Sequence, residues 1–262
     1  MQMISDVAAV LDRPETITER LVSVVERTPL RQRPFDHVCM DGLFAPDIYR
    51  EMLAEMPADY RFHQLVHRDA LRPDGSSTRL RLYLYPELLR ELSRGQRDVW
   101  VPVAEALCAV ELELALKLKF RAVLEDRFKK PAEQIRLYPI PILLRDQPGY
   151  RIGIHADVPS KAITVQFYLP QNESQRSIGT IFHDGPDGDA AKHTTQMPFM
   201  PSSGYAFPVS ATKSWHSAAE TSESDGERVS MMLTYYAAEE PLRLLKLRLR
   251  RSALRFGIHP KG

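Results

Sequence analysis

The distribution of hydrophobic and polar positions divides the chain near residue 130. Before that point, apolar residues mostly recur three or four positions apart, which is typical of helices that bury one face. After Pro131, short runs rich in Ile, Val, Tyr and Phe alternate with Gly, Pro, Asp and Ser, which is typical of strands joined by turns. Helices first and strands second predict an α+β protein with helices packed on one face of a β core.

The same pattern predicts individual elements. In the first part we expect one or two helices within 1–30, a short strand at 37–40, a helix between Pro46 and Pro57, a strand at 80–84, and helical structure from 86 to about 128 with a break near Gly95. In the second part we expect strands at 134–138, 140–144, 150–155, 162–169, 179–183, 204–208 and 228–236. Short strands separated by turn residues favour a sandwich or barrel.

We expect these elements to form a single domain over residues 1–262. Residues 1–130 would be a helical N-terminal support layer, 131–240 the β core, and 241–262 a basic C-terminal helix. That helix interleaves leucines with Arg and Lys, so it can pack on the domain with its basic side chains along the surface, lie on an anionic membrane, or bind nucleic acid. The net charge of the whole chain, +1, favours packing.

Composition and charge are those of an ordinary globular protein. Of the 262 residues, 44% are hydrophobic and 26% are charged, which is enough for a sizeable core. The near-zero net charge argues against a nucleic-acid partner, and there is no run of about 18 apolar residues that would predict a membrane span. The acidic N-terminal segment differs from a signal peptide, and Cys39 and Cys108 belong to no paired motif. We therefore expect a cytoplasmic protein with reduced thiols.

Three residues are candidate metal ligands. His155 and Asp157 are two positions apart, so a strand that continues through Asp157 would project both side chains from one face. An imidazole and a carboxylate on one face can chelate a divalent ion, and His216 offers a third ligand. Two His and one carboxylate leave coordination positions open, which suits Fe(II). The alternative for His155 and Asp157 is a surface histidine beside a turn aspartate. The alternative for His216 is a hydrogen-bonded histidine that binds no metal.

Arg228 and Ser230 share one face at the start of an apolar strand, because the strand period is two. An Arg that enters a barrel interior needs an anionic partner, since a buried unpaired guanidinium is costly. A carboxylate matches the planar guanidinium with two hydrogen bonds. The alternative is an Arg at an exposed strand end, paired with Glu223 or Glu227.

The order of these motifs resembles that of a known family. The sequence contains, in turn, His155-x-Asp157, the strand at 162–169, Gly179-Thr180-Ile181-Phe182, His216, and Arg228-x-Ser230. This order is similar to that of the Fe(II)- and 2-oxoglutarate-dependent oxygenases, in particular their prolyl-hydroxylase-like branch, over roughly residues 131–238. The resemblance implies a double-stranded β-helix, which is a distorted jelly roll of the cupin kind.

The resemblance also implies cofactors and roles for individual residues. It implies that Fe(II) is held by the His155, Asp157 and His216 side chains, and that 2-oxoglutarate and O2 are cosubstrates. Arg228 would pair with the distal carboxylate of 2-oxoglutarate, assisted by the residues Ser230 and Tyr168. Tyr138 matches the end of the strand before the metal motif and would line the pocket, although the proline-rich stretch that follows it is longer than in the family. Thr164 and Gln166 share the face of Tyr168 by strand period, so they would also point inward.

Further polar residues are candidates for binding a substrate. Arg79 and Arg81 alternate on one predicted strand and could bind an anionic substrate. The alternative is that both lie on an exposed strand face. Arg145, near the metal motif, is a similar candidate. The resemblance implies a dioxygenase that releases succinate and CO2, and we expect it to hydroxylate a C–H bond of a small molecule, such as an amino acid, a natural-product intermediate or a sugar. The alternatives are a hydroxylase of a protein or nucleic-acid side chain, and a non-catalytic jelly-roll module that binds a ligand.

Overall fold

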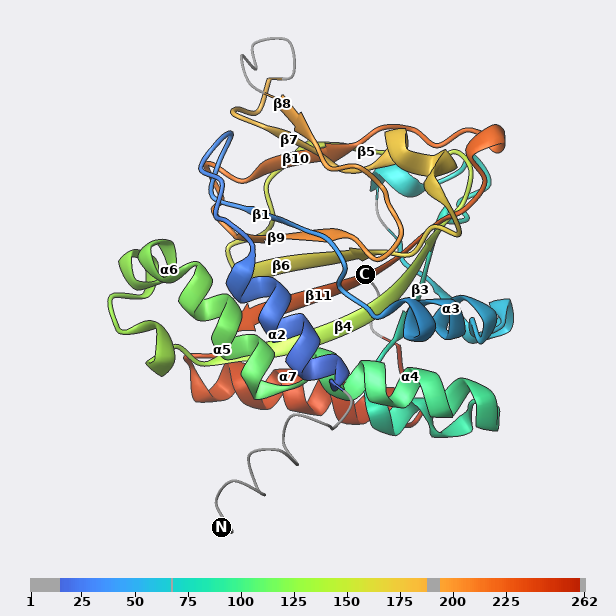
Figure 1. Ribbon diagram of the computed structural model, residues 1–262, viewed down its shortest axis with the longest axis horizontal. Helices are drawn as coiled ribbons and strands as arrows, with labels where there is room; N and C mark the ends of the chain where they lie inside the picture. Colours follow the sequence, from blue (N-terminus) through green and yellow to red (C-terminus); the bar gives the residue numbers. More distant parts are fainter. Residues whose placement is uncertain (1–14, 67, 188–193, 260–262) are drawn as a thin grey trace, which may run out of the picture.

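The computed structural model describes residues 15–66, 68–187 and 194–259. Their strands form two antiparallel sheets (Figure 1). The larger sheet runs, from edge to edge, through β1 (Val38–Met40), β9 (Gly204–Pro208), β6 (Lys161–Tyr168), β11 (Arg228–Ala237), β4 (Leu137–Asp146), β3 (Arg79–Tyr83) and β2 (His63–Gln64). The smaller sheet runs through β5 (Ile152–His155), β10 (Trp215–Ala218), β7 (Ile181–His183) and β8 (Thr194–Gln196).

The helices lie mainly on the larger sheet (Figure 1). The α-helices are α2 (Ile17–Arg27), α3 (Pro46–Ala54), α4 (Arg94–Leu107), α5 (Val110–Lys119), α6 (Arg121–Phe128) and α7 (Pro241–Leu254). The short 3-10 helices are η1 (Asp59–Arg61), η2 (Arg68–Ala70), η3 (Pro86–Glu91), η4 (Ala132–Gln134), η5 (Glu173–Ile178) and η6 (Glu223–Asp225).

One face of the larger sheet packs against the helices and the other faces the smaller sheet, as β6 illustrates. Its residues Ile163, Val165 and Phe167 are buried in one apolar cluster with residues of α2, α4 and α5, so this face carries the main core. The intervening residues Thr164 and Gln166 are buried as well, and they face the smaller sheet. Since successive side chains of a strand leave opposite faces, one strand serves both the core and the space between the sheets.

From β4 to β11 the chain passes repeatedly between the two sheets. Strands β4, β6, β9 and β11 belong to the larger sheet, and β5, β7, β8 and β10 to the smaller one. Helix α7 follows β11 and packs through Leu254 against Ile142 and Leu144, which are on the face of β4 opposite the main core. The C-terminal end of α7 is therefore anchored on the larger sheet at β4.

Two prolines are accommodated inside β4. The amide of Leu84 donates to the carbonyl of Pro141 at 3.0 Å, which places the backbone nitrogen of Pro141 on the side of β3. Strand β3 ends at Tyr83, so the missing N–H of Pro141, and that of Pro139 two residues away, cost no ladder hydrogen bond. The opposite side of β4 pairs with β11 along its whole length.

Most elements predicted from the sequence are present, but the short strands β2, β8 and β10 were not predicted and other elements differ in their bounds. The strands expected at 134–138 and 140–144 are wrong as separate elements, because they form one strand, and Gln134 belongs to η4. The helical stretch from 86 to 128 divides into η3, α4, α5 and α6. Of the expected helices within 1–30, α2 is described, and residues 1–14 lie outside the described residues. The α+β class is confirmed, and the larger sheet also takes in β1, β2 and β3, which precede Pro131.

Candidate metal centre and the buried arginine cluster

Residues from three segments meet at one end of the smaller sheet. His155 is the last residue of β5, and His216, the second residue of β10, is its direct partner across the ladder. The two imidazole rings have centroids 4.2 Å apart. Asp157 follows two residues after His155, in the turn that leads to β6, so β5 ends before the position that the sequence analysis considered. The turn still brings its carboxylate to the histidines.

The three side chains form the geometry of a metal-binding group. One ligand atom from each lies within 4.8 Å of the others. Nδ1 of His155 is 3.0 Å from the carbonyl of Gly153, and Nδ1 of His216 is 3.0 Å from the carbonyl of Ser214. Because a carbonyl can only accept, both Nδ1 atoms carry the proton, and each Nε2 has its lone pair available for a metal. Such an outer hydrogen bond is typical of metal-binding histidines.

The carboxylate of Asp157 is held by two donors. Nζ of Lys161 donates to Oδ1 at 2.5 Å, and the hydroxyl of Thr164 donates to Oδ2 at 2.7 Å. Burial by itself would raise the pKa of Asp157, but Lys161, His216 and these hydrogen bonds lower it to about 2. A carboxylate has about four lone-pair positions, so both oxygens can still accept a metal bond.

His216 is buried beside Phe207, whose ring centroid lies 5.1 Å away. Burial lowers the pKa of His216 to about 4, although the neighbouring Asp157 carboxylate works in the opposite direction. At neutral pH the site therefore holds an uncharged imidazole beside an ionised carboxylate, which are the protonation states that bind divalent metals.

Arg228, at the start of β11, is buried and forms three hydrogen bonds. Its Nη1 donates to Asp146 at 2.9 Å, its Nε to the carbonyl of Ile178 at 3.1 Å, and its Nη2 to the hydroxyl of Thr180 at 3.2 Å. The alternative of an exposed strand end is excluded, because the side chain of Arg228 is 2% exposed. Glu227, one of the partners considered for it, binds Arg145 instead.

Asp146 joins Arg228 to a second arginine. Nε and Nη2 of Arg79, on β3, donate to the two oxygens of Asp146 at 2.6 and 2.9 Å. The guanidinium of Arg79 also lies over the ring of Tyr150, 4.3 Å from its centroid. Two cations thus share one anion in a nearly dry environment, and the cluster of Arg79, Asp146 and Arg228 has one surplus positive charge. A surplus charge in such a place favours binding of an anion.

The inward residues of β6 connect the metal-binding group with the arginine cluster. Thr164 contacts Asp157, Gln166 donates to the hydroxyl of Ser230 at 2.6 Å, and the Tyr168 ring lies 5.4 Å from the guanidinium carbon of Arg228. The hydroxyl of Tyr168 accepts from the amide of Thr180. Thr164 and Tyr168 are four residues apart, about 13 Å along a strand, so the two groups are at different depths between the sheets.

The sequence analysis assigned no site role to four residues of this region: Asp146, Lys161, Thr180 and Tyr205. Tyr205, on β9, donates to Thr180 at 3.1 Å, and burial raises its pKa. Asp146 and Arg228 are direct Cα partners in the ladder of β4 and β11. Their pairing has no signal in the sequence, since it depends on the register of strands 82 residues apart.

Three predicted residues lie outside this arrangement. Arg145 projects from the other face of β4, and its guanidinium binds Glu227 and Asp59. Arg81 is buried on β3, with its guanidinium 5.3 Å from the centre of the Tyr83 ring. Tyr138 lies near the start of β4 and lines a cavity of about 1050 Å³ between α5 and α7. Roles for these residues in binding substrate or cosubstrate stay predictions.

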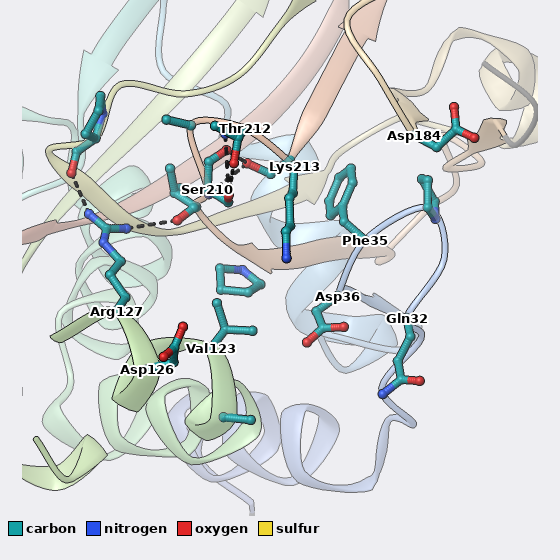
Figure 2. Close-up of a pocket in the computed structure, with 17 residues that line it drawn as sticks. Gln32, Phe35, Asp36, Val123, Asp126, Arg127, Asp184, Ser210, Thr212 and Lys213 are labelled. Atoms are coloured by element: carbon teal, nitrogen blue, oxygen red, sulfur yellow. Dashed lines mark hydrogen bonds between the residues drawn. The ribbon is translucent and has the colours of Figure 1, made fainter. Parts of the chain in front are cut away.

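A second cavity, of about 800 Å³, lies beside the chain segments that carry Asp157 and His216. Its wall combines the segment before β1, helix α6 and the loop between β9 and β10, from which the Lys213 side chain extends into the cavity (Figure 2). Pro159 and Ser214 line it, and each lies two residues from a metal-binding residue. Since none of the three metal-binding side chains lines it, the cavity neighbours the site without opening on it.

Comparison with known proteins identifies the architecture. No protein-family model and no curated protein matches the chain. Among solved structures, the chain is similar to a Pseudomonas putida prolyl-4-hydroxylase, with 14% identity, coverage of 83% of this chain and 98% of that one, and a TM-score of 0.52. The fold shared with this structure is a double-stranded β-helix. A rice dioxygenase for auxin oxidation is also similar, with 16% identity, coverage of 85% and 78%, and a TM-score of 0.51.

The fold expected from the motif order is therefore confirmed. Among the residues that the structure describes, none of the helices has the length and apolar character needed to cross a bilayer.

Proposed function

We propose that the protein is an Fe(II)- and 2-oxoglutarate-dependent dioxygenase that hydroxylates a C–H bond of a small molecule. The observation that carries this proposal is the convergence of His155, Asp157 and His216 within a double-stranded β-helix. Two imidazoles and one carboxylate fit Fe(II), because they leave positions open for a cosubstrate and O2. When bound, that group supplies oxidation of a C–H bond coupled to decarboxylation of 2-oxoglutarate to succinate and CO2.

The residues around the metal-binding group have supporting roles in this proposal. Nε2 of His155 and of His216 and the Asp157 carboxylate hold the metal, while Lys161 and Thr164 hold that carboxylate in position. Fixing the ligands in advance reduces the reorganisation needed when the metal enters.

The arginine cluster fits the distal carboxylate of 2-oxoglutarate. Arg79 and Arg228 together exceed the charge of Asp146 by one, so a bound carboxylate would neutralise the cluster. Arginine suits this role because it stays protonated when buried. Tyr168 and Ser230, which lie beside Arg228 on the same face of the larger sheet, would complete the contacts.

A small-molecule substrate is the preferred class within this proposal. The rice dioxygenase of similar fold is one for auxin oxidation, and the Pseudomonas enzyme is a prolyl-4-hydroxylase, so the fold serves more than one kind of substrate. The sequence and its net charge of +1 favour a metabolite over a nucleic acid. A cytoplasmic location belongs to the same proposal.

The proposal is tested by succinate formation from 2-oxoglutarate with Fe(II), O2 and ascorbate, measured with and without a panel of amino acids, sugars and natural-product intermediates. We expect slow release without substrate and faster release with a true substrate. The Asp157→Ala variant should lose both activities while keeping its circular dichroism spectrum. Full turnover by that variant, or failure of the wild-type protein to bind a divalent metal, would refute the assignment.

A further inference from the structure

Helix α7 has an unusual distribution of leucines. Leu242, Leu245 and Leu249 follow one another at spacings of three and four, so they form one stripe along the helix. They are 72, 52 and 59% exposed, and Phe256, seven residues after Leu249, continues the line at 81%. We call these four residues the leucine stripe. An amphipathic helix of a free-standing domain ordinarily turns such a stripe inward.

The other side of α7 already packs on the protein. Leu254 is buried with Ile142 and Leu144, and Arg251 binds Glu87 with two hydrogen bonds, at 2.6 and 2.7 Å. In Figure 1, α7 runs along the lower edge of the molecule, outside the two sheets. Since these contacts fix the rotation of the helix, the outward direction of the leucine stripe is a property of the folded chain.

Basic residues border the leucine stripe on both sides. With 100° between successive residues of a helix, Lys246 and Arg250 lie along one margin, and Arg248 and Arg255 along the other. Among the described residues of α7 and its extension, Arg251 and Arg255 form ion pairs, both with Glu87, whereas Lys246, Arg248 and Arg250 are exposed and form none. The margins therefore present cationic groups toward solvent.

The charge of the C-terminal segment is opposite to that of the rest of the chain. Residues 241–262 contain seven Lys and Arg residues and no Asp or Glu, whereas the whole chain has a net charge of +1. Residues 1–240 thus carry a net charge of −6. The near-neutral total, which favoured simple packing in the sequence analysis, conceals a strongly basic surface at one end.

We propose that α7 docks on an anionic lipid surface. A row of apolar side chains between two cationic margins matches the boundary of a bilayer, where leucine and phenylalanine enter the acyl region and Lys and Arg meet lipid phosphates. Nucleic acid offers no partner for the leucine stripe. Ile258, 62% exposed just beyond Phe256, extends the apolar edge. This inference does not depend on the proposed enzymatic function.

The test is binding of the full-length protein to vesicles. Flotation with vesicles of 70% phosphatidylcholine and 30% phosphatidylglycerol should recover the protein, and pure phosphatidylcholine vesicles should not. Binding should weaken at high salt, because the lipid charges are screened. In a Leu249→Trp variant, the tryptophan emission should shift to the blue on adding anionic vesicles, which reports entry of the leucine stripe into the bilayer.

Two double variants separate the contributions. Leu245→Gln/Leu249→Gln removes half of the leucine stripe, and Lys246→Glu/Arg248→Glu reverses a charge on each margin; each should reduce binding by at least about tenfold. The matched controls are Leu30→Gln/Leu71→Gln and Arg94→Glu/Arg176→Glu, which change exposed residues elsewhere and should bind as the wild type does.

Two results would overturn the proposal. One is the absence of binding to anionic vesicles at low salt. If the protein instead forms a dimer, and Leu245→Gln/Leu249→Gln converts that dimer to monomers, the leucine stripe is an interface between copies of the chain. The other is equal vesicle binding by the wild type and both double variants. Succinate formation without lipid is expected to be the same in all these variants, so failure here is distinguishable from failure of the enzymatic proposal.

Discussion

Thr164 connects the larger sheet to the metal-binding group through one hydrogen bond. Its hydroxyl donates to Asp157 at 2.7 Å in a buried position. Thr164→Val keeps the shape and removes the donor, so the carboxylate loses one of its two fixed contacts. We expect metal affinity to fall by about 10- to 100-fold, the usual effect of losing a group that orients a ligand. Competition of Co(II) or Mn(II) with a chromophoric chelator measures it.

Thr164→Ser is the control for that change, since it keeps the hydroxyl and loses one methyl group. Its metal affinity should stay close to that of the wild type. Equal affinities for Thr164→Val and Thr164→Ser would show that the hydrogen bond to Asp157 has no role in holding the metal.

Asp146 provides a second test on a single residue. It is the shared counter-ion of Arg79 and Arg228, and Asp146→Asn leaves both guanidinium groups buried without a negative partner. Removing one member of a buried ion pair typically costs about 3–5 kcal/mol. We expect a loss of that size in the free energy of unfolding, measured by urea denaturation.

The exposed Asp126→Asn variant is the matched control. Asp126 forms an ion pair with Lys129 on the surface, so its replacement should leave the free energy of unfolding close to that of the wild type. If Asp146→Asn were no more destabilising than Asp126→Asn, the surplus charge assigned to the cluster would be incorrect.

Single residues were predictable where the motif order fixed them. The sequence sufficed to name His155, Asp157 and His216. The first two are only two positions apart, and His216 follows them in the motif order of the family that the chain resembles. The counter-ion of Arg228 could not be named. The physical rule that a buried guanidinium needs an anion was sound, but Asp146 becomes its neighbour only through the register of β4 and β11.

Among the elements, the start of β7 depends on a glycine. A Cβ atom on Gly179 would lie 1.6 Å from the carbonyl oxygen of Met197, so no side chain fits without a backbone shift. Gly179→Ala should therefore displace β7 and Thr180, which contacts Arg228. We expect a loss of about 1–3 kcal/mol or more in the free energy of unfolding, from thermal or urea denaturation.

Gly185→Ala, four residues beyond the start of β7, is the comparison for this element. A Cβ there would meet nothing within 4 Å, so the substitution should be close to neutral. Similar stabilities for the two alanine variants would contradict the close approach of Gly179 to Met197.

Elements with a regular apolar pattern were predicted well, and short ones were not. β6 and β11 appear at nearly the expected positions, because each has continuous apolar and β-branched residues. β10 was missed although it carries His216: its four residues, Trp215–Ala218, are too few to establish a period of two. The two predicted strands around Pro139 proved to be one, since proline is tolerated where β3 ends.

On the scale of the whole molecule, the proposed ligands would join the two sheets. His155 and His216 belong to the smaller sheet, whereas Thr164 and Arg228 belong to the larger one. A metal held by the first pair and a 2-oxoglutarate molecule held by Arg228 would therefore connect them. Ligands that bind only the folded state stabilise it by mass action, and here the stabilised unit is the entire β core.

This connection predicts how thermal stability responds to ligands. At 100 times its dissociation constant, one ligand adds about 2.7 kcal/mol, which in a protein of this size corresponds to about 5–10 °C in the melting temperature. Mn(II), which does not oxidise in air as Fe(II) does, should raise the melting temperature. 2-Oxoglutarate should raise it further only when Mn(II) is present, because the keto acid binds the metal as well as the arginine cluster.

Asp157→Ala should abolish both shifts, whereas Arg228→Met should keep the Mn(II) shift and lose that of 2-oxoglutarate. A 2-oxoglutarate shift of equal size with and without Mn(II) would mean that the arginine cluster binds the acid independently of the three metal-binding residues.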